Sequence, residues 1–273
     1  MFPAVIIALL GFGCQGKNGA QNIVRLATTT SVQDTGLLDV LVDAFNKSNQ
    51  YSVRAVAAGS GQAMQLGRTG EADILLVHSP DDEEQFMAEG YGYMRVNFMH
   101  NDFVIYGPAS DPAKIKGSAN AAAAFRKIAA SGALFVSRGD KSGTHNKELK
   151  LWEAAAIKPA DGNYMEAGQG MAGTLSVANE KNAYCLADRS TYLSMKKSLV
   201  LEVVCEGAEA LLNRYSLIPV KPGESSKVNS AGAKAFFDFM LSRPAKDLIE
   251  KFGLEKYGRQ LFFYDYKVQV EDK

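Results

Sequence analysis

The sequence predicts an α/β fold with mostly parallel sheets, arranged in two lobes. From Ile23 onward, short apolar runs alternate with segments of helical apolar spacing, which is typical of consecutive strand–helix units. The chain has 273 residues, of which 47% are hydrophobic, enough for two lobes of ordinary size. Two strand-like runs, residues 102–108 and 214–220, stand where the chain is expected to cross between the lobes.

The first lobe is expected to comprise residues 22–104 and 214–273, and the second lobe residues 105–213. Residues 23–27 are predicted to form a strand, and the helix after it is expected to be capped by Asp34 or Thr35. The acidic run at 81–84 complements the start of a helix and is interpreted as a solvated face. The remaining predicted elements of this lobe are strands at 51–57 and 73–77, a short helix at 62–66, and helices at 230–240 and 245–252.

Residues 137–145 carry the strongest functional signal, because they place donors ahead of a helical pattern at 147–157. Ser142 is the expected N-cap, so the free N–H groups of Gly143, Thr144 and His145 are expected to face whatever lies before the helix. Arg138 adds a planar fork suited to a tetrahedral oxyanion, and Asp140 is placed to brace it. This pattern predicts a cradle for an anion; an ordinary capped helix with a surface arginine is the alternative.

Hydroxyl-rich turns follow two strands of the first lobe. Thr29, Thr30 and Ser31 end the first strand, and Ser60 stands between two glycines after the next one. In α/β lobes such turns lie at the carboxyl edge of the sheet, where helix N-termini converge on bound anions. Together with residues 137–145 they predict an oxyanion held in a cleft between the lobes.

Other functions are disfavoured by composition and by the motifs present. Lys and Arg number 30, as do Asp and Glu, so nucleic acid is not expected as a partner. No Cys/His spacing resembles a metal site, and no cofactor is expected. The run at 168–173 matches G-x-G-x-x-G, but a poor strand precedes it. It is interpreted as a source of backbone N–H groups for the cleft or as a tight turn, with Met171 and Leu175 in the core; dinucleotide binding is the alternative.

Residues 1–21 are interpreted as an export segment. An apolar stretch of about eleven residues is too short to span a bilayer, and Cys14 at its end resembles the lipidated residue of a bacterial lipoprotein. Export would allow Cys185 and Cys205 to form a disulfide, since each lies in a strand-like run; two buried thiols are the alternative.

Several blocks together resemble the substrate-binding components of bacterial ABC importers for tetrahedral oxyanions, and within them the tungstate receptors of the TupA type. They are residues 26–31, 34–38, 70–73, 89–92, 101–104 and 137–145. The resemblance implies a two-lobed, type II-like periplasmic binding protein, with the ligand in the interlobe cleft and two hinge crossover strands. It further implies an exported monomer that delivers tungstate to a membrane permease without catalysis. The ligand contacts it implies are Thr29, Ser31, Ser60, Arg138 and Thr144, with Thr30, Ser142 and Gly143 beside them.

Phosphate receptors of the same group carry an aspartate that accepts the proton of hydrogen phosphate. Here that position falls near His78, although His78 could also lie outside the cleft. A site made only of donors leaves a protonated oxyanion with an unpaired O–H, at a cost of roughly 1–3 kcal/mol. Tungstate, molybdate and sulfate satisfy this condition, and hydrogen phosphate does not. The resemblance makes tungstate the expected ligand, with molybdate the nearest competitor and sulfate or phosphate less favoured. An enzyme acting on a phosphorylated small molecule and a sensory anion-binding module remain as alternatives.

Overall fold

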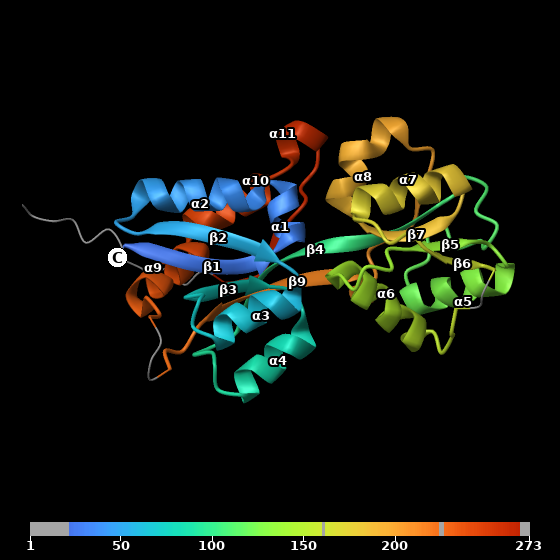
Figure 1. The fold of residues 1–273 in the computed structure, drawn as a ribbon. Coiled ribbons are helices and arrows are strands. Elements are labelled where there is room, and N and C mark those ends of the chain that lie inside the picture. Colours follow the sequence, from blue (N-terminus) through green and yellow to red (C-terminus); the bar gives the residue numbers. More distant parts are fainter. Residues whose placement is uncertain (1–21, 160–161, 224–226, 268–273) are drawn as a thin grey trace, which may run out of the picture.

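The computed structural model describes residues 22–159, 162–223 and 227–267, and in this part the strands form one ten-stranded sheet. Its main order is β2-β1-β3-β9-β4-β7-β5-β6, with β8 and β10 each paired to β4. Figure 1 shows two lobes at the two ends of this sheet, joined by β4 and β9. The predicted α/β class is therefore confirmed.

Lobe 1 contains the N-terminal units and the C-terminal helices (Figure 1). Its strands are β1 (Ile23–Thr29), β2 (Ser52–Ala58), β3 (Ile74–Val77), β10 (Phe263–Tyr264) and the adjoining parts of β4 (Val96–Gly107) and β9 (Leu212–Pro219). Its helices are α1 (Thr30–Thr35), α2 (Leu37–Ser48), α3 (Ser60–Arg68), α4 (Pro80–Ala88), α9 (Ser230–Met240), α10 (Arg243–Lys251) and α11 (Leu254–Tyr257). Apolar side chains from both faces of the sheet pack under these helices.

Lobe 2 is built from the segment between β4 and β9. Its strands are β5 (Phe135–Ser137), β6 (Tyr164–Glu166), β7 (Tyr184–Asp188) and β8 (Glu202–Cys205). Its helices are α5 (Ala121–Ser131), α6 (Gly143–Ala154), α7 (Met171–Lys181), α8 (Arg189–Met195) and the 3₁₀ turns η1 (Lys196–Ser198) and η2 (Glu209–Leu211). Met171 and Leu175 of α7 lie in its core, as the sequence predicted.

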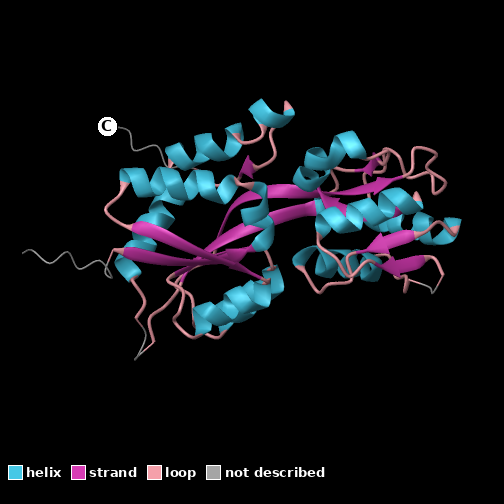
Figure 2. Cartoon of the chain, turned by 45° about the horizontal axis from the view of Figure 1, so that its top comes forward, coloured by secondary structure: helices cyan, strands magenta, loops and turns pink. Residues whose placement is uncertain are grey.

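The sheet is parallel at its two ends and antiparallel at its centre. β1 runs parallel to β2 and β3, and β5 runs parallel to β6 and β7. β4 and β9 pair antiparallel with each other, because one strand carries the chain out of lobe 1 and the other brings it back. Figure 2 shows these long central strands running from one lobe into the other. The expectation of mostly parallel sheets is thus right for the outer strands of each lobe and wrong for the centre of the sheet, where β3 pairs antiparallel with β9 and β7 pairs antiparallel with β4.

The chain passes between the lobes at a defined point of β4. Residues Val96 to Asp102 pair with β9, and from Phe103 onward the strand pairs with β7. Asn101 and Asn213 face each other across β4 and β9, both are buried, and the Asn213 side chain donates to Asn101 Oδ1 at 2.8 Å. A buried amide pair thus joins the two crossover strands.

The proposed disulfide between Cys185 and Cys205 is wrong, and the alternative of two buried thiols is confirmed. Cys185 pairs with Tyr106 on one side of β4, while Cys205 pairs with Ile105 on the other side. Two strands separated by a third lie about 9–10 Å apart, beyond the reach of a disulfide. Burial raises the pKa of both thiols, that of Cys205 to about 11.

The acidic run at 81–84 is not a wholly solvated face, because Glu83 is buried. Its carboxylate accepts from the Ser79 N–H at 2.6 Å, from Arg95 Nε at 2.6 Å and from Ser216 Oγ at 2.6 Å. Glu83 therefore fixes the turn between β3 and α4, in which His78 and Ser79 lie.

Candidate functional site

The turn between β5 and α6 presents backbone donors at a helix start. Ser142 is the N-cap of α6, as predicted. Its Oγ accepts from the His145 N–H at 3.3 Å, so the expectation that this N–H is free is wrong. The N–H groups of Gly143 and Thr144 have no acceptor among the described residues. They point outward at the positive end of a twelve-residue helix, which is a favourable arrangement for an anion.

Arg138 is held in place by its neighbour in the same turn. Its Nε and Nη2 donate to Asp140 Oδ2 at 3.1 and 2.5 Å, and the Ser142 N–H donates to Asp140 Oδ1 at 3.1 Å. Partial burial raises the pKa of Asp140, but hydrogen bonds from Ser142 and the charge of Arg138 outweigh it and leave the pKa below its ordinary value. An ionised Asp140 thus fixes the guanidinium fork, which confirms the predicted brace.

The backbone of this turn requires a glycine at position 139. Gly139 has φ +64, and a Cβ there would lie 2.6 Å from the Cβ of Glu166 on β6. The carbonyl of Arg138 accepts from the Gly168 N–H at 2.9 Å. The turn is therefore packed tightly against the loop that precedes α7, and Arg138 has little freedom at its backbone.

The turns of lobe 1 lie side by side at the carboxyl edge of the sheet, as the sequence predicted. Thr29 pairs with Ala58, and Thr28 pairs with Leu76, so the ends of β1, β2 and β3 are adjacent. Thr29 is buried at the N-cap position of α1, and Ser60 is the first residue of α3. Both helices begin earlier than predicted, so these hydroxyls lie at helix starts. The side chains of Thr30 and Ser31 lie outside the described residues.

His78 brings lobe 1 into contact with the predicted anion cradle. It follows β3, and its Cε1 lies 3.0 Å from the position that a Cβ would occupy at Gly143. The imidazole packs on Tyr215 with a centroid distance of 4.9 Å. Burial lowers its pKa to about 4, although a hydrogen bond with Asn213 opposes this shift. His78 is therefore a neutral group at physiological pH, placed at the interlobe contact.

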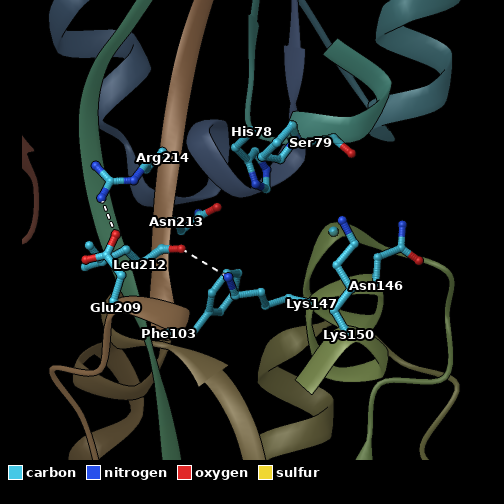
Figure 3. Close-up of a pocket in the computed structure, with 12 residues that line it drawn as sticks. His78, Ser79, Phe103, Asn146, Lys147, Lys150, Glu209, Leu212, Asn213 and Arg214 are labelled. Atoms are coloured by element: carbon cyan, nitrogen blue, oxygen red, sulfur yellow. Dashed lines mark hydrogen bonds and ion pairs between the residues drawn. The ribbon is translucent and has the colours of Figure 1, made fainter. Parts of the chain in front are cut away.

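Cavities flank this contact on both sides of the cleft. One, of about 240 Å³, is lined by His78 and Gly143 together with Lys147, Lys150, Arg214 and other residues of both lobes (Figure 3). The other, of about 420 Å³, lies among Thr35, the start of α7, α8 and Lys256. The end of α1 and the turn after β3 thus each line a cavity together with residues of lobe 2. Among the predicted residues, the structure places Gly143 directly against lobe 1.

Lys147 and Asn213 were missed by the sequence analysis, and His145 was predicted for its backbone N–H but not for its side chain. Lys147 stands four residues after Gly143, so helical spacing alone would have placed it on the same face of α6. Asn213 gave no local signal, because its role depends on the pairing of β4 with β9. His145 is buried, and its Nδ1 accepts from the Lys141 N–H at 3.0 Å, so it supports the turn from within.

The described ranges contain no group of three or more His, Cys, Asp or Glu side chains placed to hold a metal ion. Within the same ranges, no helix has both the length and the apolar character needed to cross a bilayer.

Comparison with known proteins identifies the family. Residues 16–244 match the PBP superfamily domain. The tungstate-binding protein TupA of Peptoclostridium acidaminophilum is 45% identical over 269 residues, which cover 94% of each chain. The chain belongs to the TupA family.

Solved structures of this family share the fold. The tungstate-binding protein TupA from Desulfovibrio alaskensis G20 superposes with a TM-score of 0.83 at 42% identity, covering 90% of this chain and 99% of that one. A structure described as the tungstate ABC transporter from Geobacter sulfurreducens gives a TM-score of 0.74 at 41% identity, covering 85% and 99%. The periplasmic-binding-protein fold implied by the sequence blocks is therefore confirmed, and relatives in this family are binding proteins of transporters.

Proposed function

We propose that this protein binds tungstate outside the inner membrane and delivers it to the permease of an ABC importer. One observation supports this most. Arg138, fixed by Asp140, and the free backbone N–H groups at the start of α6 belong to lobe 2, and the neutral His78 of lobe 1 contacts this helix start. The carboxylate in the turn, Asp140, is already bonded to Arg138 and Ser142. Such a site offers donors to an oxyanion, and its carboxylate is already occupied by other hydrogen bonds.

The proposed ligand contacts are Thr29, Thr30, Ser31, Ser60, Arg138, Ser142, Gly143 and Thr144. They come from the turns that face each other across the cleft, with lobe 1 formed by residues 22–104 and 214–273 and lobe 2 by residues 105–213. The arrangement supports binding without catalysis, since the proposed contacts are hydroxyls, backbone N–H groups and a guanidinium, which are donors for an anion.

A titration series on ligand-stripped protein tests this function. Calorimetry with tungstate, molybdate, sulfate and phosphate should show tight binding of tungstate and molybdate across pH 6–8 and far weaker binding of phosphate. The reason is that hydrogen phosphate leaves its O–H unpaired, which costs about 1–3 kcal/mol. Phosphate competing with tungstate at similar concentration would contradict the proposal.

The variant His78→Asp tests the basis of that selectivity. A carboxylate at the interlobe contact should weaken dianion binding by like-charge repulsion and improve phosphate relative to tungstate. The variant His78→Asn adds no charge and is the matched control. An unchanged ranking of ligands in His78→Asp would remove His78 from the site.

The remaining expectations concern export and assembly. We propose that residues 1–21, which lie outside the described residues, direct export, that Cys14 is lipidated, and that the mature protein is a monomer. Mass spectrometry of the mature N-terminus would show a diacylglyceryl group on Cys14, and light scattering would give the mass of one chain.

A further inference from the structure

The cavity beside His78 and Gly143 contains a concentration of positive charge that the proposed ligand contacts do not use. Lys147, Lys150 and Arg214 line it, and Glu209 is the acidic residue among its lining side chains (Figure 3). In a chain with 30 basic and 30 acidic residues, net charge does not attract an anion, so a local cluster of this kind decides where one approaches.

Two of these cations are neutralised in the structure, and one is not. Arg214 Nη2 pairs with Glu209 at 2.5 Å, and Lys150 Nζ pairs with Asp81 at 2.6 Å. Lys147 is half-buried, and its Nζ donates to the Leu212 carbonyl at 3.3 Å; no carboxylate pairs with it in the part of the chain that the structure describes. The cavity therefore contains one positive charge, that of Lys147, whose hydrogen-bond partner is a backbone carbonyl.

The pair between Lys150 and Asp81 joins the two lobes, since Lys150 lies on α6 and Asp81 on α4. Separation of the lobes would break it and leave Lys150 beside Lys147 on the same helix. The positive charge on this side of lobe 2 would then rise at the moment when the cleft is open to solvent. Burial and the neighbouring charges of Lys150 and Arg214 lower the pKa of Lys147, although Glu209 opposes them, consistent with an excess of positive charge around it.

The cavity also leads directly to the cradle. Gly143, whose N–H has no acceptor among the described residues, lies in its wall, and His78 lies beside it. An anion held near Lys147 is thus one helical turn from the proposed binding position. The cavity of about 420 Å³ on the other side of the cleft contains Lys256 as its basic side chain, on the exposed helix α11.

We propose that the Lys147 cavity is an encounter site for tetrahedral dianions, where tungstate binds transiently before it enters the cradle. This inference rests on the proposed function of the cleft. Lys147, assisted by Lys150 in the open state, raises the local concentration of the anion and so raises the association rate. The cation does not contact the anion once the lobes have closed on it.

The test compares Lys147→Met with Lys256→Met, which remove one positive charge from opposite sides of the cleft. Stopped-flow measurements can follow the fluorescence of the single tryptophan, Trp152 of α6. Isotope exchange gives the dissociation rate independently. Dividing that rate by the Kd from calorimetry gives the association rate. At low ionic strength, Lys147→Met should slow association of tungstate about three- to tenfold and leave dissociation unchanged. The difference should shrink as salt is raised, because screening shortens the reach of the charge. Lys256→Met should change association by less than twofold, and Lys147→Arg should restore it.

Equal association rates in Lys147→Met and Lys256→Met would overturn the encounter site. A faster dissociation rate with unchanged association would also overturn it, since Lys147 would then stabilise the closed complex. Circular dichroism and thermal unfolding of each variant exclude misfolding, which Lys147→Arg checks independently. If the unmodified protein binds tungstate tightly and Lys147→Met does not change the association rate, only this inference is refuted. If the unmodified protein does not bind tungstate, the proposed function itself is refuted.

Discussion

The two lobes meet the cleft with different chemistry. The turn of lobe 2 carries a full positive charge on Arg138, braced by Asp140, and an open helix start at Gly143. The contacts proposed for lobe 1 are the neutral hydroxyls of Thr29 and Ser60, which lie near the neutral imidazole of His78 at the ends of neighbouring strands. Arg138, Asp140 and Gly143 lie within one short segment, whereas the three neutral groups of lobe 1 come from the ends of three adjacent strands.

This difference indicates that the two lobes contribute differently to the binding free energy. A charged, self-supporting turn can hold an anion while the cleft is open, because Arg138 needs no residue of lobe 1 to fix it. The neutral edge of lobe 1 can then close over the anion without a second charge to desolvate. Lobe 2 should therefore supply most of the binding free energy, and lobe 1 should supply the closure and the exclusion of water.

The largest test of this division is Arg138→Ala, which should weaken tungstate binding by about 2–5 kcal/mol, since a buried dianion loses the nearby guanidinium. Arg138→Lys should recover part of the loss, because the charge remains but the bidentate fork is gone. Arg126→Ala, an exposed arginine on α5 of the same lobe, is the control and should bind normally. Calorimetry gives each Kd. Near-normal affinity in Arg138→Ala would contradict the claim that lobe 2 supplies most of the binding free energy.

Deletion of one hydroxyl in each lobe sharpens the comparison. Thr144→Val in lobe 2 and Ser31→Ala in lobe 1 should each cost about 1–3 kcal/mol of binding, the range for a hydrogen bond to a charged group. Ser198→Ala, on an exposed turn of lobe 2, should have no effect. If Thr144→Val weakened binding and Ser31→Ala did not, lobe 1 would not contact the anion.

The sequence predicted well those features that depend on neighbours within a few residues. The Ser142 cap and the Asp140 brace lie inside nine residues, and local hydrogen bonds decide both. The resemblance of several blocks to a known family then gave the two-lobed fold, which no single segment could show.

Features set by strand order or by contacts across the cleft were not predictable in the same way. Cys185 and Cys205 lie in strand-like runs, but β4 inserts between them. Glu83 belongs to an acidic run, but Arg95 and Ser216 compensate its burial. The contact of His78 with Gly143 joins residues from different lobes, so only the folded chain shows that His78 faces the cradle.

That contact makes Gly143→Ala a test of closure. A Cβ at position 143 would meet His78 Cε1 at 3.0 Å, so the lobes should be unable to approach fully. Overpacking of this kind should weaken tungstate binding by about 1–2 kcal/mol and leave the saturated protein more extended in solution scattering. Gly170→Ala is the control, because it also stands at a helix start and a Cβ there meets no atom within 4 Å. Equal affinities in the two variants would show that closure does not need the His78–Gly143 contact.

An effect of similar size is expected on the pH dependence of stability. It tests whether the group that lobe 1 places at the contact, His78, is neutral. The pKa of His78 falls from 6.5 to about 4 in the folded protein, so between these values the unfolded chain binds more protons than the folded one. The contribution of His78 to stability is therefore fully present above about pH 6.5 and is lost as the pH falls toward 4. Between pH 7 and pH 5 the unmodified protein should lose about 1–2 kcal/mol more unfolding free energy than His78→Asn, in which that proton cannot bind. Urea unfolding of both proteins at the two pH values measures this difference. If the two proteins lost the same free energy, His78 would not be a neutral group buried at the contact, and the division between a charged lobe 2 and a neutral lobe 1 would have to be redrawn.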